Sequence, residues 1–295
     1  MRLRLGRLGV AAMGAALALA LTACGGGGGG DDVKVNTKAS FPAGSTMAKW
    51  NKAGKIKIGV KFDQPGIGYK KPGTDTPEGF DVEMAKIVAG RLGIDADNIE
   101  WVETVSANRE QFIQKGTVDL VLASYTINDE RRKVVGQAGP YYKTGQQFLI
   151  AKDATWFKTN EDIKGKKVCS VTGSTSLDSV EQKYGAKPVP FGSYSECVTQ
   201  LKSGSVDAVT TDGAILLGYQ AEDPDKVQVV GDEFTVEPYG IGYKHGDAQL
   251  CAFLNDTIKK SEDDGSWQKA FDNTLGKVEG VKKPTPPTPD PCPSA

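Results

Sequence analysis

Apolar runs and amphipathic segments alternate along residues 55–151, and their order predicts an α/β unit. Strands are expected at 55–60, 99–102, 120–123 and 147–151, with helices at 82–92 and 106–115 between them. The strand segments are short and rich in Ile and Val, as buried strands are. Met84, Ile87 and Val88 fall on one face of the first helix, and Asp81 is a candidate N-cap. This order of elements is typical of an α/β lobe.

The same alternation restarts near residue 162 and predicts a second lobe. Strands are expected at 167–171, 188–191, 206–210 and 227–230, and helices at 172–184 and 194–202. A strand at 237–243 then returns to the first lobe, where helices at 248–260 and 266–275 close the fold. Two lobes joined by two crossings have a hinge and a cleft, and such a cleft is the usual place for a small ligand.

The first residues carry the features of an export signal. Arginines within the first seven residues precede an apolar stretch at 10–21, and Leu21-Thr22-Ala23-Cys24 follows. The stretch is too short to span a bilayer comfortably and fits a secretory signal. A cysteine at this point resembles the bacterial lipobox, which implies cleavage before Cys24 and a lipid on that residue. The alternative is a plain secreted protein in which Cys24 is incidental.

These patterns divide the chain into segments with different expected roles. We expect a signal peptide at 1–23, a lipidated cysteine with a flexible tether at 24–52, lobe 1 at 53–147 and 237–280, lobe 2 at 148–236, and a proline-rich tail at 281–295. A glycine run at 25–30 is the basis for the tether. No second apolar run is long enough for a membrane helix, so the lipid would be the membrane contact.

Composition and charge narrow the function classes. The formal net charge is −1, and no basic patch with interleaved aromatic residues is found, which argues against a nucleic-acid partner. A metal site is a weak alternative for the cysteines, because no pair has C-x-x-C spacing and His245 is the one histidine. We therefore expect no metal and no cofactor, and a monomer.

Four cysteines remain after Cys24, and an even number in an exported chain indicates disulfides. Three pairings are open. The sequence-local choice, Cys169–Cys197 and Cys251–Cys292, is preferred, and each bond would contribute roughly 3.5 to 4 kcal/mol in the chain-entropy model. The second bond would hold the proline-rich tail.

Polar residues recur where the predicted strands end, most clearly in the stretch 118–132. The candidate ligand-binding residues are Lys61, Ser106, Arg109, Ser124, Thr126 and Arg131 in the first lobe, and Gly173, Ser174, Thr175 and Asp212 in the second. Ligands of open α/β sheets bind outside the carboxyl ends of the strands. An arginine offers a planar fork to a carboxylate, and a helix start at 173–176 offers free N–H groups to an anion.

The charges and hydrogen-bonding groups of these candidate residues predict a ligand with two carboxylates and one ammonium. Arg131, with Ser124 and Thr126, would hold one carboxylate, whereas Asp212 would accept hydrogen bonds from the ammonium. Lys61 and Arg109 remain for a second carboxylate, which describes glutamate or aspartate. Each residue also has a structural explanation: a solvated lysine, a turn aspartate, or a plain capped turn at 173–176 that lacks the P-loop pattern.

Two segments resemble the family 3 extracellular solute-binding proteins, the polar amino-acid receptors of ABC importers. They are GFDVEM at 79–84, with the apolar residues that follow it, and residues 119–131, where Ser124, Thr126 and Arg131 match the family's ligand positions. The resemblance covers about residues 55–275. It implies a two-lobed, type II periplasmic-binding-protein-like fold. It also implies that Asp212 binds the α-ammonium and that Thr175 caps the α-carboxylate.

Within the family, the chain is similar to the glutamate-binding lipoproteins of actinobacteria. Ser106 and Arg109 look like the side-chain-carboxylate clamp of the glutamate/aspartate branch, and Lys61 replaces an arginine of some members. Tyr194 stands where that branch has a histidine. The resemblance implies a lipid-anchored receptor on the outer face of the cell membrane. It would bind L-glutamate, and L-aspartate too, for an ABC permease.

Two other interpretations remain open at this stage. Glutamine or asparagine would suit the same class of receptor, although a neutral amide would leave Lys61 and Arg109 partly unpaired. An exported enzyme on the same fold, such as a dehydratase, is the alternative from another class, since Asp212 could act as a base. No Ser/His/Asp set can be built around His245, so we expect no enzymatic activity.

Overall fold

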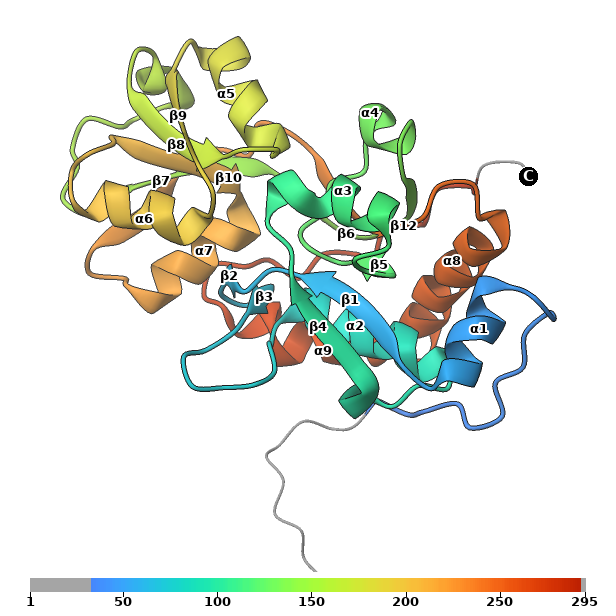
Figure 1. Ribbon diagram of the computed structural model, residues 1–295. Coiled ribbons are helices and arrows are strands. Elements are labelled where there is room, and N and C mark those ends of the chain that lie inside the picture. The colour runs from blue at the N-terminus through green and yellow to red at the C-terminus, as the bar shows by residue number, and fades with distance from the viewer. Residues whose placement is uncertain (1–32, 293–295) are drawn as a thin grey trace, which may run out of the picture. The chain divides into compact units, whose positions relative to one another are not determined.

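Two five-stranded sheets form the framework of the computed structural model, which describes residues 33–292 (Figure 1). The first sheet has the order β4-β1-β5-β12-β6 and the second has the order β11-β7-β10-β8-β9. The first consists of β1 (Ile56–Val60), β4 (Ile99–Glu103), β5 (Leu120–Val121), β6 (Gly136–Thr144) and β12 (Glu237–Tyr243). The second consists of β7 (Gln146–Ala151), β8 (Lys167–Val171), β9 (Lys187–Phe191), β10 (Ala208–Asp212) and β11 (Val227–Val230). The predicted two-lobed α/β fold is confirmed.

Both sheets are mixed, with a parallel half and an antiparallel half. In the first, β1 pairs in parallel with β4 and β5, whereas β12 runs antiparallel to β5 and β6. In the second, β8 pairs in parallel with β9 and β10, whereas β7 runs antiparallel to β10 and β11. The parallel strands β5 and β10 thus point their carboxyl ends toward the segments that carry the predicted ligand residues.

Helices cover the sheets, and a small hairpin lies between the lobes. The helices are α1 (Thr46–Ala53), α2 (Phe80–Arg91), α3 (Arg109–Lys115), α4 (Asp129–Arg132), α5 (Thr175–Tyr184), α6 (Tyr194–Lys202), α7 (Gly213–Glu222), α8 (Ala248–Asp263) and α9 (Ser266–Asn273). Short 3₁₀ turns are η1 (Ala96–Asn98), η2 (Ser106–Asn108), η3 (Asn160–Ile163) and η4 (Leu275–Lys277). The hairpin, β2 (Asp63–Gln64) with β3 (Gly68–Tyr69), belongs to the first lobe and packs against α6 and α7 of the second.

The chain passes between the lobes twice. Gly145 alone joins β6 of the first sheet to β7 of the second, and residues 231–236 lead from β11 back to β12. β12 lies beside both β5 and β6, so the returning crossing ends next to the central strand. This places the start of β12 at the hinge and at the cleft together.

Aromatic rings fill the core of the first lobe beneath this region. The rings of Trp267 and Phe271 are stacked at 5.7 Å, and Phe80 meets Trp267 edge-on at 5.6 Å. Trp267 also donates from Nε1 to the carbonyl of Tyr141 at 2.8 Å. Aromatic pairs of this kind contribute about 0.5–1.5 kcal/mol beyond their buried area. They fix α2 and α9 against the sheet from which the site is built.

Several elements differ from the sequence-based expectations. Residues 46–53 form helix α1 within the segment expected to be a flexible tether, because Met47 is buried and Trp50 donates to Asp119 at 3.1 Å. Helix α7 was not predicted, since it is apolar on nearly all sides and shows no amphipathic period. The predicted signal peptide and Cys24 lie outside the described residues.

Both predicted disulfides are present, Cys169–Cys197 and Cys251–Cys292. The second joins the proline-rich tail to α8. Asp290 reinforces the attachment, because its N–H donates to the carbonyl of Gly139 at 2.7 Å.

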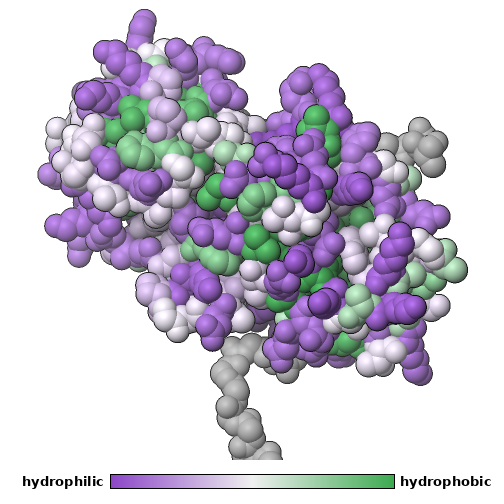
Figure 2. Space-filling model, in the orientation of Figure 1, coloured by the Kyte–Doolittle hydropathy of each residue, from purple (hydrophilic) through white to green (hydrophobic). Residues whose placement is uncertain are grey.

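Hydrophilic residues cover most of the face in Figure 2, with hydrophobic ones gathered in small groups between them. Among residues 33–292, no helix has the length and apolar character needed to span a bilayer.

Candidate functional site

The loop after β5 holds the centre of the site in a strained backbone conformation. Ser124 has a φ of 43°, and its N–H donates to the buried carboxylate of Asp81 at 2.7 Å. The other oxygen of Asp81 accepts from the hydroxyl of Tyr141 at 2.6 Å, and burial raises the pKa of Asp81 to about 6. Asp81 is therefore not the N-cap of α2, a position that Gly79 takes, but a support for this loop.

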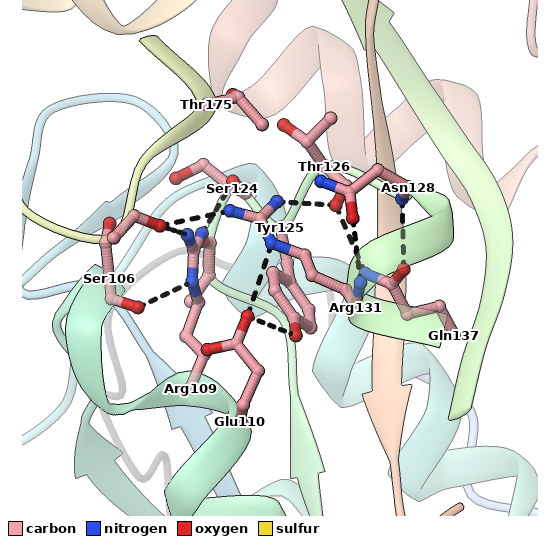
Figure 3. A network of polar contacts seen from close by, with 12 residues as sticks. Ser106, Arg109, Glu110, Ser124, Tyr125, Thr126, Asn128, Arg131, Gln137 and Thr175 are labelled. Atoms are coloured by element: carbon pink, nitrogen blue, oxygen red, sulfur yellow. Dashed lines mark hydrogen bonds and ion pairs between the residues drawn. The ribbon is translucent and has the colours of Figure 1, made fainter. Parts of the chain in front are cut away.

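Arg131 ends this loop region in the short helix α4, which Asn128 caps by accepting from the N–H of Arg131 at 2.9 Å. The Arg131 side chain is buried. It donates to the carbonyl of Thr126 at 2.6 Å, and its Nε pairs with Glu110 at 3.2 Å. These contacts leave the Nη2 end free to face the second lobe, where it donates to the carbonyl of Gly173 at 3.1 Å (Figure 3).

Arg109 reaches the same point from α3. Its Nε donates to the carbonyl of Ser106, and its Nη1 donates to the carbonyls of Ala123 and Ser124, each bond being 3.1–3.2 Å long. Nη2 then donates to the Gly173 carbonyl at 3.0 Å. Burial and the nearby positive charge of a second arginine lower the pKa of Arg109 to about 10, so it stays protonated at neutral pH.

Both guanidinium groups lie over the ring of one tyrosine, Tyr125. The Arg109 and Arg131 guanidinium carbons lie 4.6 and 4.9 Å from the centre of the Tyr125 ring, and the Tyr125 hydroxyl donates to Glu110 at 2.8 Å. Such cation–π contacts are strongest where water is excluded. The two cations are held side by side over the ring despite their repulsion (Figure 3). Both Nη2 atoms donate to the carbonyl oxygen of Gly173.

Gly173 occupies a position that no other residue fits. Its φ is +81°, and a Cβ there would lie 2.9 Å from the Cα of Ala107 in the opposite lobe. Its carbonyl oxygen accepts hydrogen bonds from both arginines of the first lobe.

The next residues open helix α5 as predicted. Ser174 is the N-cap and accepts from the N–H of Leu177 at 3.1 Å. Thr175 and Ser176, whose first-turn N–H groups have no intrahelical acceptor, line the cavity. Thr175 also donates its hydroxyl proton to Glu237 at 2.9 Å.

Asp212 supplies the negative charge on the second lobe. It is buried at the end of β10, and its Oδ2 accepts from the hydroxyl of Tyr239 at 2.6 Å. Burial, followed by the nearby carboxylate of Glu237, raises the pKa of Asp212 to about 8, against the opposing effect of Arg109 and Arg131. A cation brought next to Asp212 would favour its ionised form.

Lys61 lies outside the cavity lining, next to Ser106. It is buried, and its Nζ donates to the hydroxyl of Ser106 at 2.8 Å. Burial, followed by the positive charge of Arg109, lowers the pKa of Lys61 to about 7. Lys61 therefore approaches the cavity through Ser106 and does not line it.

Tyr194 begins α6 with its side chain buried. Burial raises the pKa of Tyr194, and its side chain lines the cavity. It thus closes the cavity from the second lobe.

Nine predicted residues and three others line a cavity of about 10 Å³ between the lobes. They are Ser106, Arg109, Ser124, Thr126, Arg131, Ser174, Thr175, Tyr194 and Asp212, together with Ser176, Thr211 and Ile215. This volume accommodates about one water molecule, so an amino acid enters only if the lobes move apart. Among the described residues, no group of three His, Cys, Asp or Glu side chains could hold a metal ion.

Two acidic residues in this region were missed by the sequence analysis. Glu237 opens β12 and is buried behind Thr126 and Thr175, to which it is hydrogen-bonded. A glutamate before a proline at a hinge strand was a local signal, but only the fold brings it to the cleft.

Asp63, the second missed residue, begins strand β2 in the hairpin of the first lobe. Its carboxylate accepts from the N–H groups of Tyr194 and Ser195, at 2.9 and 3.3 Å, at the start of α6. The hydroxyl of Tyr219 donates to the Asp63 carbonyl. Asp63 thus fastens the first lobe to the N-terminus of a second-lobe helix, where a negative charge is favoured.

Comparisons with known proteins find several amino-acid-binding proteins similar to this chain. A glutamate-binding protein GluB from Corynebacterium efficiens is 37% identical over 93% of this chain and 92% of its own. The ABC transporter glutamine-binding protein GlnH of Bacillus subtilis is 36% identical over 85% and 90%. A solved structure is described as an ancestral amino acid-binding protein and a precursor of cyclohexadienyl dehydratase. It is 31% identical, with a TM-score of 0.71 over 78% of this chain and all of its own.

The family described as bacterial extracellular solute-binding proteins, family 3, matches residues 56–277. The match covers both sheets and every residue that lines the cavity. The chain therefore belongs to the family 3 bacterial extracellular solute-binding proteins.

Proposed function

We propose that this protein is an extracellular receptor that captures L-glutamate, and also L-aspartate, for the permease of an ABC importer. The observation that carries the proposal is the convergence of two buried arginines on one point of the cleft, 3.0 and 3.1 Å from the Gly173 carbonyl oxygen. Lys61 lies behind them and Asp212 faces them from the second lobe. Two carboxylates and one ammonium are the ligand groups that complement this charge pattern.

The two arginines have different amounts of donor capacity left for a ligand. Arg109 spends three of its N–H groups on carbonyls of its own lobe, whereas Arg131 spends one on Thr126 and one on the Glu110 ion pair. Arg131 therefore suits two-pronged binding of the α-carboxylate, with the N–H groups at the start of α5 completing the site. Arg109, together with Lys61 and Ser106, suits the side-chain carboxylate.

Closure follows from contacts with both lobes. A ligand carboxylate would replace the Gly173 carbonyl as acceptor of the arginine N–H groups. Its ammonium would meet Asp212 on the second lobe. A ligand shifts an equilibrium between conformations only by its difference in affinity for them, and contacts to both lobes supply that difference.

The membrane attachment and the transport partner are part of the proposal. Cys24, preceded by an apolar stretch and followed by glycines, supports a lipid anchor on the outer face of the membrane. The family description supports an extracellular location, and the printed name of the Bacillus relative, which includes ABC transporter, supports the permease partner.

Glutamine is the competing ligand, because the Bacillus relative is named for it. A side-chain amide would leave Arg109, which stays protonated at neutral pH, without a ligand counter-charge in a buried place, which is costly. Chemistry on the ligand is the other competitor, since one solved relative is a dehydratase precursor. We propose binding without turnover, because Asp212 is placed to pair with an ammonium. Recovery of unchanged glutamate by NMR after prolonged incubation tests this.

Isothermal titration of the purified protein with L-glutamate, L-aspartate, L-glutamine and L-arginine tests the ligand assignment. We expect one-to-one binding of glutamate, with glutamine at least about 100-fold weaker, because a site built for a charged partner rejects one that leaves it unpaired. A preference for glutamine or arginine would overturn the roles given to Lys61 and Arg109.

A further inference from the structure

Glu237 joins the two sides of the cavity through a single oxygen. Its Oε2 accepts from the hydroxyl of Thr126 in the first lobe at 2.7 Å and from that of Thr175 in the second at 2.9 Å. Its Oε1 accepts from Thr235 at 2.7 Å. Glu237 is 3% exposed and does not itself line the cavity, whereas Thr126 and Thr175 do. Any effect of Glu237 on a ligand therefore passes through these two hydroxyls.

The direction of these hydrogen bonds decides what the threonines can offer a ligand. A hydroxyl has one proton to donate and two lone pairs that accept. Thr126 and Thr175 both direct that proton to Glu237, so only their lone pairs remain for the cavity. A carboxylate, which only accepts, gains nothing from such a hydroxyl, but an ammonium group, which only donates, does.

The charges of Asp212 and Glu237 also favour an ammonium group in this part of the cavity. Asp212 lies next to Glu237, which contributes to the raised pKa of Asp212. Among the described residues, no lysine or arginine forms an ion pair with either carboxylate. Two neighbouring buried acids without a paired cation attract a positive group.

We infer that Glu237 is a positioning residue that makes the part of the cavity lined by Thr126 and Thr175 selective for the α-ammonium group. It does so by holding both threonine hydroxyls as hydrogen-bond acceptors. The inference rests on the proposed function and deepens it, because it names what separates an amino acid from a dicarboxylate without the amino group. Thr175 then serves the α-carboxylate with its backbone N–H, and its hydroxyl serves the ammonium.

The test compares L-glutamate with (S)-2-hydroxyglutarate, which has the same two carboxylates and a hydroxyl in place of the ammonium. Kd values for both are measured by calorimetry for the wild type, Glu237→Gln and Thr126→Val. We expect the preference for glutamate to fall by at least about tenfold in each variant, because each removes the charge or the acceptor that favours the ammonium. The double variant should lose little more than either single one, since both act through one contact.

Asp63→Asn is the matched control. Asp63 joins the lobes but does not itself line the cavity, and it contacts the backbone of Tyr194 and not its side chain, so its loss should weaken both ligands by the same factor and leave the preference unchanged. If Glu237→Gln and Thr126→Val also weaken both ligands equally, Glu237 is a hinge support and the inference is wrong.

The same design separates this inference from the ligand assignment. If the wild type binds L-glutamine in place of L-glutamate, the assignment fails, and the comparison is made between glutamine and its α-hydroxy analogue with the same expectation. If the wild type does not distinguish either amino acid from its α-hydroxy analogue, the inference about Glu237 is overturned.

Discussion

A single added methyl group at Gly218 tests whether function depends on the contact between the lobes. Gly218 lies within α7 of the second lobe, and a Cβ there would be 2.3 Å from the carbonyl oxygen of Pro65 in the first. The backbone of α7 itself accepts alanine readily. Gly218→Ala should therefore favour the helix by about 0.5–1 kcal/mol while obstructing closure.

The size of the effect follows from the neighbouring contacts. Relief of the clash requires the two segments to separate by about 1 Å. The bond from the N–H of Tyr194 to Asp63, now 2.9 Å, would then exceed hydrogen-bonding distance, and the Tyr219 contact with Asp63 would weaken. Loss of these interlobe bonds costs roughly 1–3 kcal/mol, which corresponds to about a 5- to 150-fold higher Kd for glutamate.

Three measurements examine this prediction together. Calorimetry gives the Kd, urea unfolding gives the stability, and small-angle X-ray scattering of the saturated protein gives its dimensions. We expect weaker binding, equal or higher stability and a more open ligand-bound form. Gly192→Ala is the control, because a Cβ there meets only the carboxylate of Glu196 at 3.2 Å. An unchanged Kd in folded Gly218→Ala would refute the view that this contact forms in the bound state.

Further predictions concern the charges and the disulfides. Arg131→Ala should weaken glutamate binding by roughly 2–5 kcal/mol, since a buried carboxylate loses its partner, and a Kd near the wild-type value would contradict this. Arg109→Ala should weaken glutamate far more than glutamine; equal losses in calorimetry would exclude a side-chain clamp. At pH 7, Asp212 with a pKa of about 8 holds its proton, and an ammonium favours its ionised form. Binding should therefore release a proton from Asp212, and the affinity for glutamate should rise with pH up to about 8. Calorimetry in buffers of different ionisation enthalpy should detect the proton release in the wild type but not in Asp212→Asn. Replacing Cys251 and Cys292 by alanine should lower the free energy of unfolding by about 4 kcal/mol, as the loop spans 41 residues, and urea titration measures it.

Local patterns predicted most of the second lobe and the sides of the first. The strand 167–171 and the helix 194–202 match β8 and α6 residue for residue, because the strand is a short buried run and the helix begins after a capping serine, Ser193. The disulfide pairing was also predicted from sequence spacing. Polar residues at strand ends were predicted to meet, and eight of them line one cavity together with Tyr194, which the family resemblance had indicated. These features depend on short-range rules that hold for parallel strands in general.

Other features gave no usable local pattern. Strand β6 contains Gly139 and Pro140, which are uncommon inside strands, so its sequence does not indicate a strand. Helix α7 is apolar on nearly all sides, so its sequence has no amphipathic period. Asp81 has the sequence appearance of an N-cap, but the site draws its carboxylate to the N–H of Ser124. In each case tertiary contacts outweigh a weak local preference.

The sequence by itself determined the α/β order and the chemical kinds of group that gather at the cleft, because periodicity and strand ends are local properties. It favoured one of three disulfide pairings, and the structure has that pairing. Only the tertiary structure decided which of those groups lie together. It aimed Arg109 and Arg131 at one oxygen and placed Glu237 behind two threonines from different lobes. It also set the pKa of Asp212, because burial and the approach of charges distant in the chain depend on packing, which a linear pattern does not record.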